Sequence, residues 1–335
     1  MASIKNILYI PWFLALALTA TLSSAEINER VLICGVCRNV AATVPNTIAN
    51  IEKLGNAFTD YRVIIYENNS TDGTKSLLSA WAQQAHKVTF ISEDLAAAQL
   101  PPTREGKIAR ARNIVLAQAR AMKYKKYKYL IMVDLDFSGP WPIAEIVSSL
   151  KRRVKWDCIS ANGLGRVPPV GKTPVYWDRY AFRSKRYPLG PEVLGERWWA
   201  DLPLACGKPH EWFSLNQSKW LSVYSAFGGL AIYKTKTILK FSYSPVVTKA
   251  VEQYYRKILR AVDQSNPQLQ KYQEALRNAG LTQCSSIFCL TTKPMESITC
   301  CEHLPLHAAM ALRGYNKFYV NPKMKVYYFD NTKNP

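Results

Sequence analysis

The sequence has no internal repeat and no low-complexity linker, so neither a repeat array nor a string of tethered small domains is expected. It also has no Gly-rich phosphate loop, because the first apolar run continues into GVCRNV, which supplies only Gly35. A nucleotidyltransferase-like α/β enzyme normally needs such a loop and is therefore a disfavoured alternative. What is present is 335 residues, 48% of them hydrophobic, enough for one large domain with a sizeable core.

Acidic residues are scarce as well. The chain has 24 Asp and Glu against 44 Lys and Arg, a formal net charge of +20. This excess predicts attraction to phosphates, to nucleic acid or to an anionic membrane surface. The densest basic clusters lie at 123–128 and 151–155. They are expected to be solvated faces or contacts to an anionic membrane. A non-catalytic basic module that binds anionic glycan or nucleic acid is thus the alternative to an enzyme.

Residues 1–25 have the composition of a targeting segment. One Lys precedes an uncharged stretch at 7–22, and small residues follow up to Ala25. This pattern predicts a secretory signal peptide that ends at about Ala25, with a short membrane anchor as the alternative. We expect export in either case, which makes nucleic acid a poor partner.

All eight cysteines follow this segment, at positions 34, 37, 158, 206, 284, 289, 300 and 301. An even number in an exported chain suits disulfides, and Cys284 and Cys289 bracket a short loop across which they could pair. Cys34 and Cys37 have CxxC spacing, but no second such pair accompanies them. Structural or buried thiols are therefore favoured over redox or zinc chemistry.

Apolar runs alternate with helical patterns from residue 30 to residue 140. Short continuous apolar runs are typical of strands buried on both faces. We expect strands at 31–36, 62–66, 88–91 and 129–133 and helices at 44–57, 73–85 and 108–122. This order predicts an α/β fold, a mostly parallel sheet flanked by helices, with ligands at the carboxyl ends of its strands.

The alternation weakens beyond residue 157. Residues 163–213 are dense in Pro, Gly, Arg and Trp, which predicts an irregular insertion, and long loops of this kind are usually functional. Beyond it we expect a loop entering a strand at 227–233, helices at 246–261, 267–279 and 303–313, and a last strand at 325–329.

Two carboxylates, Asp134 and Asp136, end the strand predicted at 129–133. In an extended chain they point to the same side, and they repel each other unless a cation or hydrogen bonds spread the charge. Hard oxygen ligands favour Mn²⁺ or Mg²⁺ and leave coordination positions for substrate phosphates. Taken alone, the pair could equally cap a turn and be solvated.

A second polar turn, YENNSTDGT at 66–74, follows another strand of the same sheet. Glu67, Asn69 and Asp72 are expected along the same rim as the two aspartates, where acceptors and amides suit a nucleoside. An Asx turn with a helix cap at Asp72 is the alternative, which leaves Glu67 unexplained.

Two arginines, Arg110 and Arg112, lie in IARARN near the start of the helix predicted at 108–122. Positive charge at the start of a helix is destabilised by the helix dipole, so a bound anion would stabilise both arginines. A solvated basic face is the alternative for either residue alone.

Together these blocks resemble the GT-A glycosyltransferases, particularly the large family 2-type group. The resemblance rests on the first strand at 31–39, YENNSTDGT, ARARN, VDLDF, FGGLAIYK at 227–234 and the block at 300–322. It covers roughly 30–240 and 298–328, and the order and spacing of the blocks are more specific than any one motif. YWDRYAFR at 176–183 is similar to fungal capsule α-mannosyltransferases, which does not fix the sugar.

This resemblance implies a metal-dependent transfer of a hexosyl group from a nucleoside-diphosphate sugar to a hydroxyl of a glycan, glycoprotein or glycolipid. It implies one GT-A-like domain over 30–335, with a nucleotide-sugar-binding half at 30–140 and an acceptor-binding half at 157–335. The second half would carry the irregular insertion and a C-terminal helical insertion. Donors of this kind and an export signal together predict the lumen of the Golgi or ER, with an exported bacterial protein as the alternative.

The resemblance also implies roles for single residues. Asp136 would hold the metal on the diphosphate, where it offsets charge on the departing group. The donor would be bound by Glu67, Asn69, Asp72, Arg110, Arg112 and Asp134, of which Asp134 would face the ribose or the metal.

A late block supplies the expected catalytic base. Glu302 matches the acidic residue that opens a helix in the family, and its carboxylate would take the proton of the acceptor hydroxyl. Family members often carry Glu-Asp where this chain has Glu302-His303, and a late His ligates the metal in some of them, so His303, or His307 one turn on, would ligate the metal here. An ordinary helix-surface position is the alternative for either histidine and is favoured for His307.

The acceptor side draws on the irregular insertion and on the FGGLAIYK block. Trp177, Asp178 and Trp212 suit a sugar ring, which stacks on an aromatic face and hydrogen-bonds at its rim. Packing of the loop is the alternative for part of the tryptophans. Gly228 and Gly229 belong to the same acceptor side, and Asp178 is a reserve candidate for the base.

Overall fold

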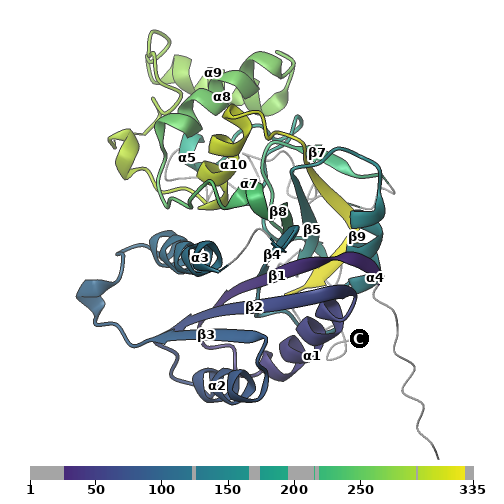
Figure 1. Cartoon of the computed structure of the whole chain (residues 1–335). Coiled ribbons are helices and arrows are strands. Elements are labelled where there is room, and N and C mark those ends of the chain that lie inside the picture. Colours follow the sequence, from purple (N-terminus) through teal and green to yellow (C-terminus); the bar gives the residue numbers. More distant parts are fainter. Residues whose placement is uncertain are drawn as a thin grey trace, which may run out of the picture.

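The computed structural model describes residues 26–122, 126–165, 174–194, 215, 219–291 and 293–328. These residues form a nine-stranded sheet in the order β3-β2-β1-β4-β8-β5-β9-β7, with β6 paired to β5. Helices cover both faces of the sheet, and several more gather in a lobe at one side (Figure 1). The predicted α/β architecture is confirmed.

The amino-terminal half of the sheet is parallel, as predicted. It consists of β1 (Ile27–Cys37), β2 (Phe58–Asn68), β3 (Val88–Glu93) and β4 (Tyr129–Asp134). The apolar runs of β1, β2 and β4 are buried on both faces, which is why they read as continuous rather than alternating patterns.

The second half of the sheet is mixed, so the prediction of a mostly parallel sheet holds only for the first half. Its strands are β5 (Cys158–Gly165), β6 (Val175–Tyr176), β7 (Leu221–Val223), β8 (Leu230–Lys234) and β9 (Phe318–Tyr327). β8 runs antiparallel between β4 and β5, whereas β5 and β9 are parallel.

Two hydrophobic clusters fill the two faces of the sheet. One packs under α1 (Val44–Gly55), α2 (Thr74–Gln84) and α4 (Ile143–Lys151). The other packs under α3 (Arg104–Ala121), α8 (Lys249–Ala261), α9 (Pro267–Asn278) and α10 (His303–Leu312). Short helical turns complete the described chain: η1 (Ala97–Gln99), α5 (Pro191–Leu194), α7 (Thr235–Ile238) and η4 (Met295–Ser297).

The C-terminal helical insertion forms α8 and α9, as the sequence predicts. Side-chain caps fix where they begin: Thr248 accepts from Val251 N, and Asn266 accepts from Gln268 N and Leu269 N. Pro267 occupies the first turn of α9, where its missing N–H costs nothing.

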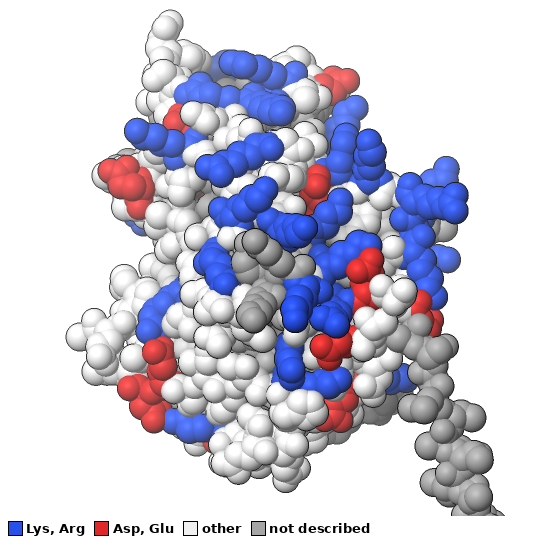
Figure 2. Space-filling view, in the orientation of Figure 1, with Lys and Arg blue, Asp and Glu red and all other residues white. Residues whose placement is uncertain are grey.

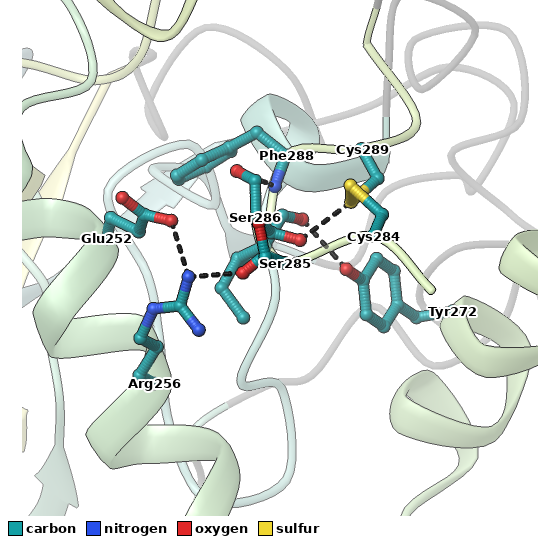
Figure 3. Close-up of a disulfide and its surroundings, with 9 residues drawn as sticks. Glu252, Arg256, Tyr272, Cys284, Ser285, Ser286, Phe288 and Cys289 are labelled. Carbon is teal, nitrogen blue, oxygen red and sulfur yellow. Dashed lines mark hydrogen bonds and ion pairs between the residues drawn. A yellow bond between two sulfur atoms is a disulfide. The ribbon is translucent and has the colours of Figure 1, made fainter. Parts of the chain in front are cut away.

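The predicted pairing of Cys284 with Cys289 is confirmed, and this disulfide closes the loop after α9 (Figure 3). Arg256 of α8 holds the same loop, because its guanidinium bonds both Glu252 Oε1 at 2.8 Å and the Ser285 carbonyl. Free thiols are found at Cys34, Cys158, Cys300 and Cys301, which are buried as expected, and at Cys37, which is partly exposed.

Several sequence predictions lie outside the described residues. They concern the targeting segment at 1–25, most of the irregular insertion, Trp212 and Cys206. Within the described residues, every helix is too short or too polar to span a bilayer.

Candidate active site

A cleft of about 830 Å³ opens at the carboxyl ends of β1 and β4. Its wall combines the loop after β1, the first turns of α3, the end of β4, residues 177–180 and the start of α10. Asp136 and Glu302, far apart in sequence, therefore face one space. This is the edge of the sheet at which ligands are expected in an open α/β fold.

Asp134 is held at the end of β4 by three polar contacts. Its backbone N–H donates to Gly229 O at 2.8 Å, Arg112 Nη2 lies 2.9 Å from Oδ1, and the Tyr328 hydroxyl donates to Oδ2 at 3.1 Å. Burial raises the pKa of Asp134, and the positive charge of Arg112 opposes that rise. The carboxylate is thus fixed in place with 26% of its side chain exposed to the cleft.

Asp136 projects into the cleft without an ion-pair partner in the described part of the chain. Desolvation between the cleft walls, and next the charge of Asp134, raise the pKa of Asp136 to about 7. A carboxylate in this setting is stabilised by any cation that arrives with a ligand.

Arg112 is the central cation of the site. It is 3% exposed, and its Nη1 lies 2.7 Å from Glu302 Oε1 while Nη2 holds Asp134. Its guanidinium also stacks over Phe227, 4.3 Å from the ring centroid. Arg112 therefore ties the start of α10 to the end of β4, and Glu302 is buried beside it.

His303 lines the cleft next to Glu302. Its ring stacks on Phe227 at 3.9 Å between centroids, and neither ring nitrogen has a hydrogen-bond partner among the described residues. Burial, followed by the charges of Arg112 and His307, lowers the pKa of His303 well below its usual value. The imidazole is therefore neutral, the form that binds metals.

The residues of the cleft could bind a divalent cation only if a bound substrate completed its coordination. The described residues contain no cluster of three or more His, Cys, Asp and Glu side chains that would hold a metal by themselves. Asp134 and Asp136 offer hard oxygen ligands at one strand end, and the unpartnered nitrogens of His303 are further donor atoms. Two or three protein ligands suit a metal whose coordination is completed by substrate phosphates.

The YENNSTDGT turn contributes less to the cleft than the sequence predicts. Glu67 is 0% exposed and accepts from Ser70 N and Ser92 Oγ, both at 2.6 Å. Asp72 accepts from Thr74 N and from Ala41 N, each at 3.0 Å. The two carboxylates thus shape the turn and the start of α2.

Asn69 and Arg110 are also engaged away from the cleft wall. Asn69 has φ +54° and donates to Leu95 O at 2.8 Å. Arg110 pairs with Glu93 at 2.9 Å and donates to the Tyr66 hydroxyl at 2.6 Å. From this turn, Asn68 is the residue that lines the cleft, and the sequence prediction missed it.

The predicted acceptor side forms the opposite wall. Trp177 is 47% exposed and Asp178 lies next to it, its Oδ2 accepting from Gly228 N at 2.9 Å. Burial raises the pKa of Asp178 to about 6. Gly228 and Gly229 have φ of +64° and +79°. A Cβ on Gly228 would lie 2.1 Å from Ala161 O, so only glycine fits there. The two glycines therefore set the backbone path behind this wall and do not line the cleft themselves.

Among the basic side chains that line the cleft, Arg38 after β1 and Arg104 and Lys107 in the first turns of α3 were not predicted. They form no ion pair with a described carboxylate. Arg104 and Lys107 flank the capping motif of α3, in which Thr103 accepts from Gly106 N, and this local signal could have indicated an anion site.

Comparison with known proteins supports one family for the amino-terminal half. Residues 33–138 match the model of the family described as Glycosyl transferase family 2. This segment is similar to the family 2 glycosyltransferases. The match runs from within β1 through β4 and includes Asp134 and Asp136 of the cleft, whereas the α10 side of the cleft lies beyond it. No curated protein matches the chain in sequence.

The solved structures that resemble this chain are distant from it in sequence. Staphylococcus aureus TarS 1–349 is 12% identical with a TM-score of 0.39, over 89% of this chain and 60% of its own. A Pyrobaculum calidifontis mannosyltransferase, solved with GDP-Man and Mn²⁺, is 16% identical with a TM-score of 0.40, over 85% and 75%. GalNAc-T7, solved with UDP, GalNAc and Mn²⁺, is 13% identical with a TM-score of 0.44, over 90% and 44%.

Proposed function

We propose that this protein transfers a hexosyl group from a nucleoside-diphosphate sugar to a hydroxyl acceptor, with a divalent metal at Asp134 and Asp136. The observation that carries the proposal is the shared cleft. It joins the carboxylates at the end of β4 to basic side chains on one wall and to an exposed Trp with a carboxylate on the other.

The donor half of the cleft has the charges that a diphosphate needs. Arg38, Arg104 and Lys107 supply positive charge at its mouth, and Arg112 supplies it from below. Asp134 and Asp136 would hold Mn²⁺ or Mg²⁺, which when bound offsets the negative charge of the diphosphate. Because Arg112 fixes Asp134, the strand end is preorganised for that ion.

The acceptor half offers a stacking face and a base. Trp177 is exposed enough to lie against a sugar ring, and Asp178 is adjacent to it. Protonating Glu302, the base expected from the sequence, would break its buried ion pair with Arg112 at 2.7 Å. Burial raises the pKa of Asp178 to about 6, so we assign the acceptor proton to Asp178 and charge balance to Glu302.

Replacing Asp136 by Asn is the direct test of this function. We expect wild-type protein to hydrolyse at least one donor slowly in a panel of UDP- and GDP-sugars with Mn²⁺, measured as released nucleoside diphosphate. Asp136→Asn is expected to lower that rate on the order of 10³-fold, because it removes a charged ligand from the diphosphate site. Asp263→Asn, on an exposed turn before α9, is the control and should leave the rate unchanged.

The non-catalytic alternative makes the opposite forecast. A basic binding module would retain polyanion binding in Asp136→Asn and would turn over no donor in either protein. That result would exclude the proposed glycosyltransferase function.

Asp178→Asn is expected to stabilise the fold at neutral pH. Burial disfavours the charged carboxylate, and its pKa is about 6 in the fold against 3.8 for a free Asp. The folded state therefore binds more protons between these values, and stability falls as pH rises through them. Asn keeps an oxygen for the Gly228 N–H, so we expect a gain on the order of 2 kcal/mol above pH 6 that vanishes below about pH 4.

Thermal and urea unfolding across this pH range measure the effect. A gain of the same size at every pH would contradict the burial of an ionised Asp178. If Asp178 also takes the acceptor proton, Asp178→Asn will retain donor hydrolysis by water better than transfer to an acceptor.

A further inference from the structure

The sheet edge opposite to the cleft gathers basic residues from distant parts of the chain. Tyr129, at the start of β4, pairs with Lys234 at the end of β8, and Cys158, at the start of β5, pairs with Phe318 at the start of β9. Six exposed residues lie on or beside this edge, and we call them the basic edge: Lys155, Lys234, Lys236, Lys240, Arg313 and Lys317.

The charge of the basic edge is not balanced by neighbouring carboxylates. Within the described chain, none of its six side chains forms an ion pair with an Asp or Glu. Nearby acids are already engaged: Glu29 pairs with Lys128, Glu26 pairs with Lys151 at 3.5 Å, and Asp157 accepts the Lys317 backbone N–H at 3.0 Å. Figure 2 shows that Lys and Arg side chains outnumber acidic ones over the face that carries α7, α8 and α9.

Aromatic and aliphatic groups accompany the charges. Lys234 lies over the Trp156 ring at 5.3 Å and Lys240 over the Tyr315 ring at 5.3 Å. Val154 is 42% exposed and Leu312 is 39% exposed, each next to a residue of the basic edge. A bilayer interface accommodates both basic and apolar side chains of this kind.

The path of the chain points to the same partner. β1 begins at Ile27 on this edge, where Lys128 N donates to Arg30 O at 3.0 Å. The uncharged apolar stretch of the sequence ends at Leu22, just before the first described residue, Glu26. Whether that stretch stays in a membrane or is removed, the chain meets the folded domain at its basic side.

Helix α10 fixes the distance between this edge and the cleft. It begins at the cleft with His303 and ends at Leu312 beside Arg313, so about 15 Å of helix separates the two. We propose that the basic edge rests on an anionic lipid bilayer and that the cleft opens on the far side, toward the aqueous phase. Acceptor groups then reach the cleft from solution rather than from within the bilayer.

Amine labelling of the full chain tests this orientation without any need for activity. The protein is mixed with vesicles of phosphatidylcholine alone, or of phosphatidylcholine with phosphatidylserine, and lysine acetylation is measured by mass spectrometry. We expect Lys234, Lys236 and Lys240 to be labelled several-fold more slowly on the anionic vesicles. Exposed lysines elsewhere, at Lys257 and Lys325, serve as internal controls and should be labelled equally on both.

Charge reversal gives the matched variants. Changing Lys234, Lys236 and Lys240 to Glu should abolish the protection of Lys155 and Lys317 and weaken electrostatic attraction to the surface on the order of 100-fold at low salt. Reversing Lys257, Lys323 and Lys325 should not, and the melting temperature of both variants checks that they fold.

Two results would overturn the proposal. One is equal labelling of the basic edge on neutral and anionic vesicles. The other is protection by soluble heparin that equals or exceeds protection by anionic vesicles and is unchanged in Leu312→Ser, which would assign the surface to a soluble polyanion.

Discussion

Arg112→Met is expected to destabilise the protein by about 3–5 kcal/mol, because it leaves the buried Glu302 and the partly buried Asp134 without their shared cation. Asp134 lies 2.9 Å and Glu302 lies 2.7 Å from the guanidinium, whose side chain is only 4% exposed. Met fills a similar volume without supplying charge or N–H donors. Urea unfolding at neutral pH, with the slope checked against wild type, measures the loss.

Arg110→Met is the matched control for this prediction. Arg110 lies two residues away on the same helix and pairs with Glu93, but the two side chains are 30% and 35% exposed. An exposed pair of this kind contributes about 1 kcal/mol or less. Equal losses in the two variants would mean that the Arg112 network does not hold the cleft together.

A double variant separates the lost charge from lost packing. Adding Glu302→Gln to Arg112→Met removes one of the two unpaired carboxylates, so part of the stability should return. The two changes are in contact and are expected to be non-additive by 0.5–3 kcal/mol, roughly the range for coupled neighbours. Strict additivity would contradict the ion pair between Arg112 and Glu302.

The first half of the fold could be predicted because its signals are local. The strands β1, β2 and β4 are buried on both faces and are therefore continuous apolar runs, and each is followed by a polar turn. Asp134 and Asp136 follow directly from that pattern, since a parallel strand must end at the rim where ligands bind.

The strand β5 was missed because its buried residues include polar ones. In CISANGLG every residue is buried, yet Ser160 and Asn162 interrupt the apolar run. Their polar groups are satisfied across the fold, since Ser160 Oγ donates to Ala226 O at 2.8 Å and Asn162 Nδ2 to Pro322 O at 3.0 Å. No local pattern encodes such partners.

The last strand was predicted at 325–329 and extends over Phe318–Tyr327. Pro322 lies within it, and Pro ordinarily argues against the interior of a strand. The structure accommodates it with an irregularity in the β5 pairing between Ser160 and Asn162. Helix α4 was also missed: its pattern is amphipathic, but the helix is short.

Roles within the site were harder to predict than its location. Glu67 and Asp72 were predicted to contact the donor, and in the structure both carboxylates accept backbone N–H groups of their own turn. Arg112 was predicted to contact the donor; in the structure its guanidinium also pairs with Asp134 of β4 and Glu302 of α10, contacts that spacing on a helix cannot show.

Glu192→Ala is expected to lower the free energy of unfolding by about 3–5 kcal/mol, because it leaves a second buried guanidinium without its carboxylate partner. Arg183 is 1% and Glu192 3% exposed, and Nη2 lies 2.7 Å and 2.8 Å from the two carboxylate oxygens. Arg183 Nε also donates to the Tyr255 hydroxyl of α8 at 2.8 Å. The control is Glu252→Ala, which breaks the solvent-accessible ion pair with Arg256 on α8. It should lower the free energy of unfolding by about 0.5 kcal/mol.

This second ion pair matters to the cleft because of what it anchors. The segment at 174–194 carries Trp177 and Asp178 at one end and Arg183 with Glu192 at the other, so loosening the anchor should free the acceptor wall. Hydrogen exchange should then rise at 174–194 before it rises in β1 or β4, and transfer to an acceptor should fall further than donor hydrolysis. A uniform rise across the sheet would show instead that the Arg183 pair supports the whole domain and not the wall alone.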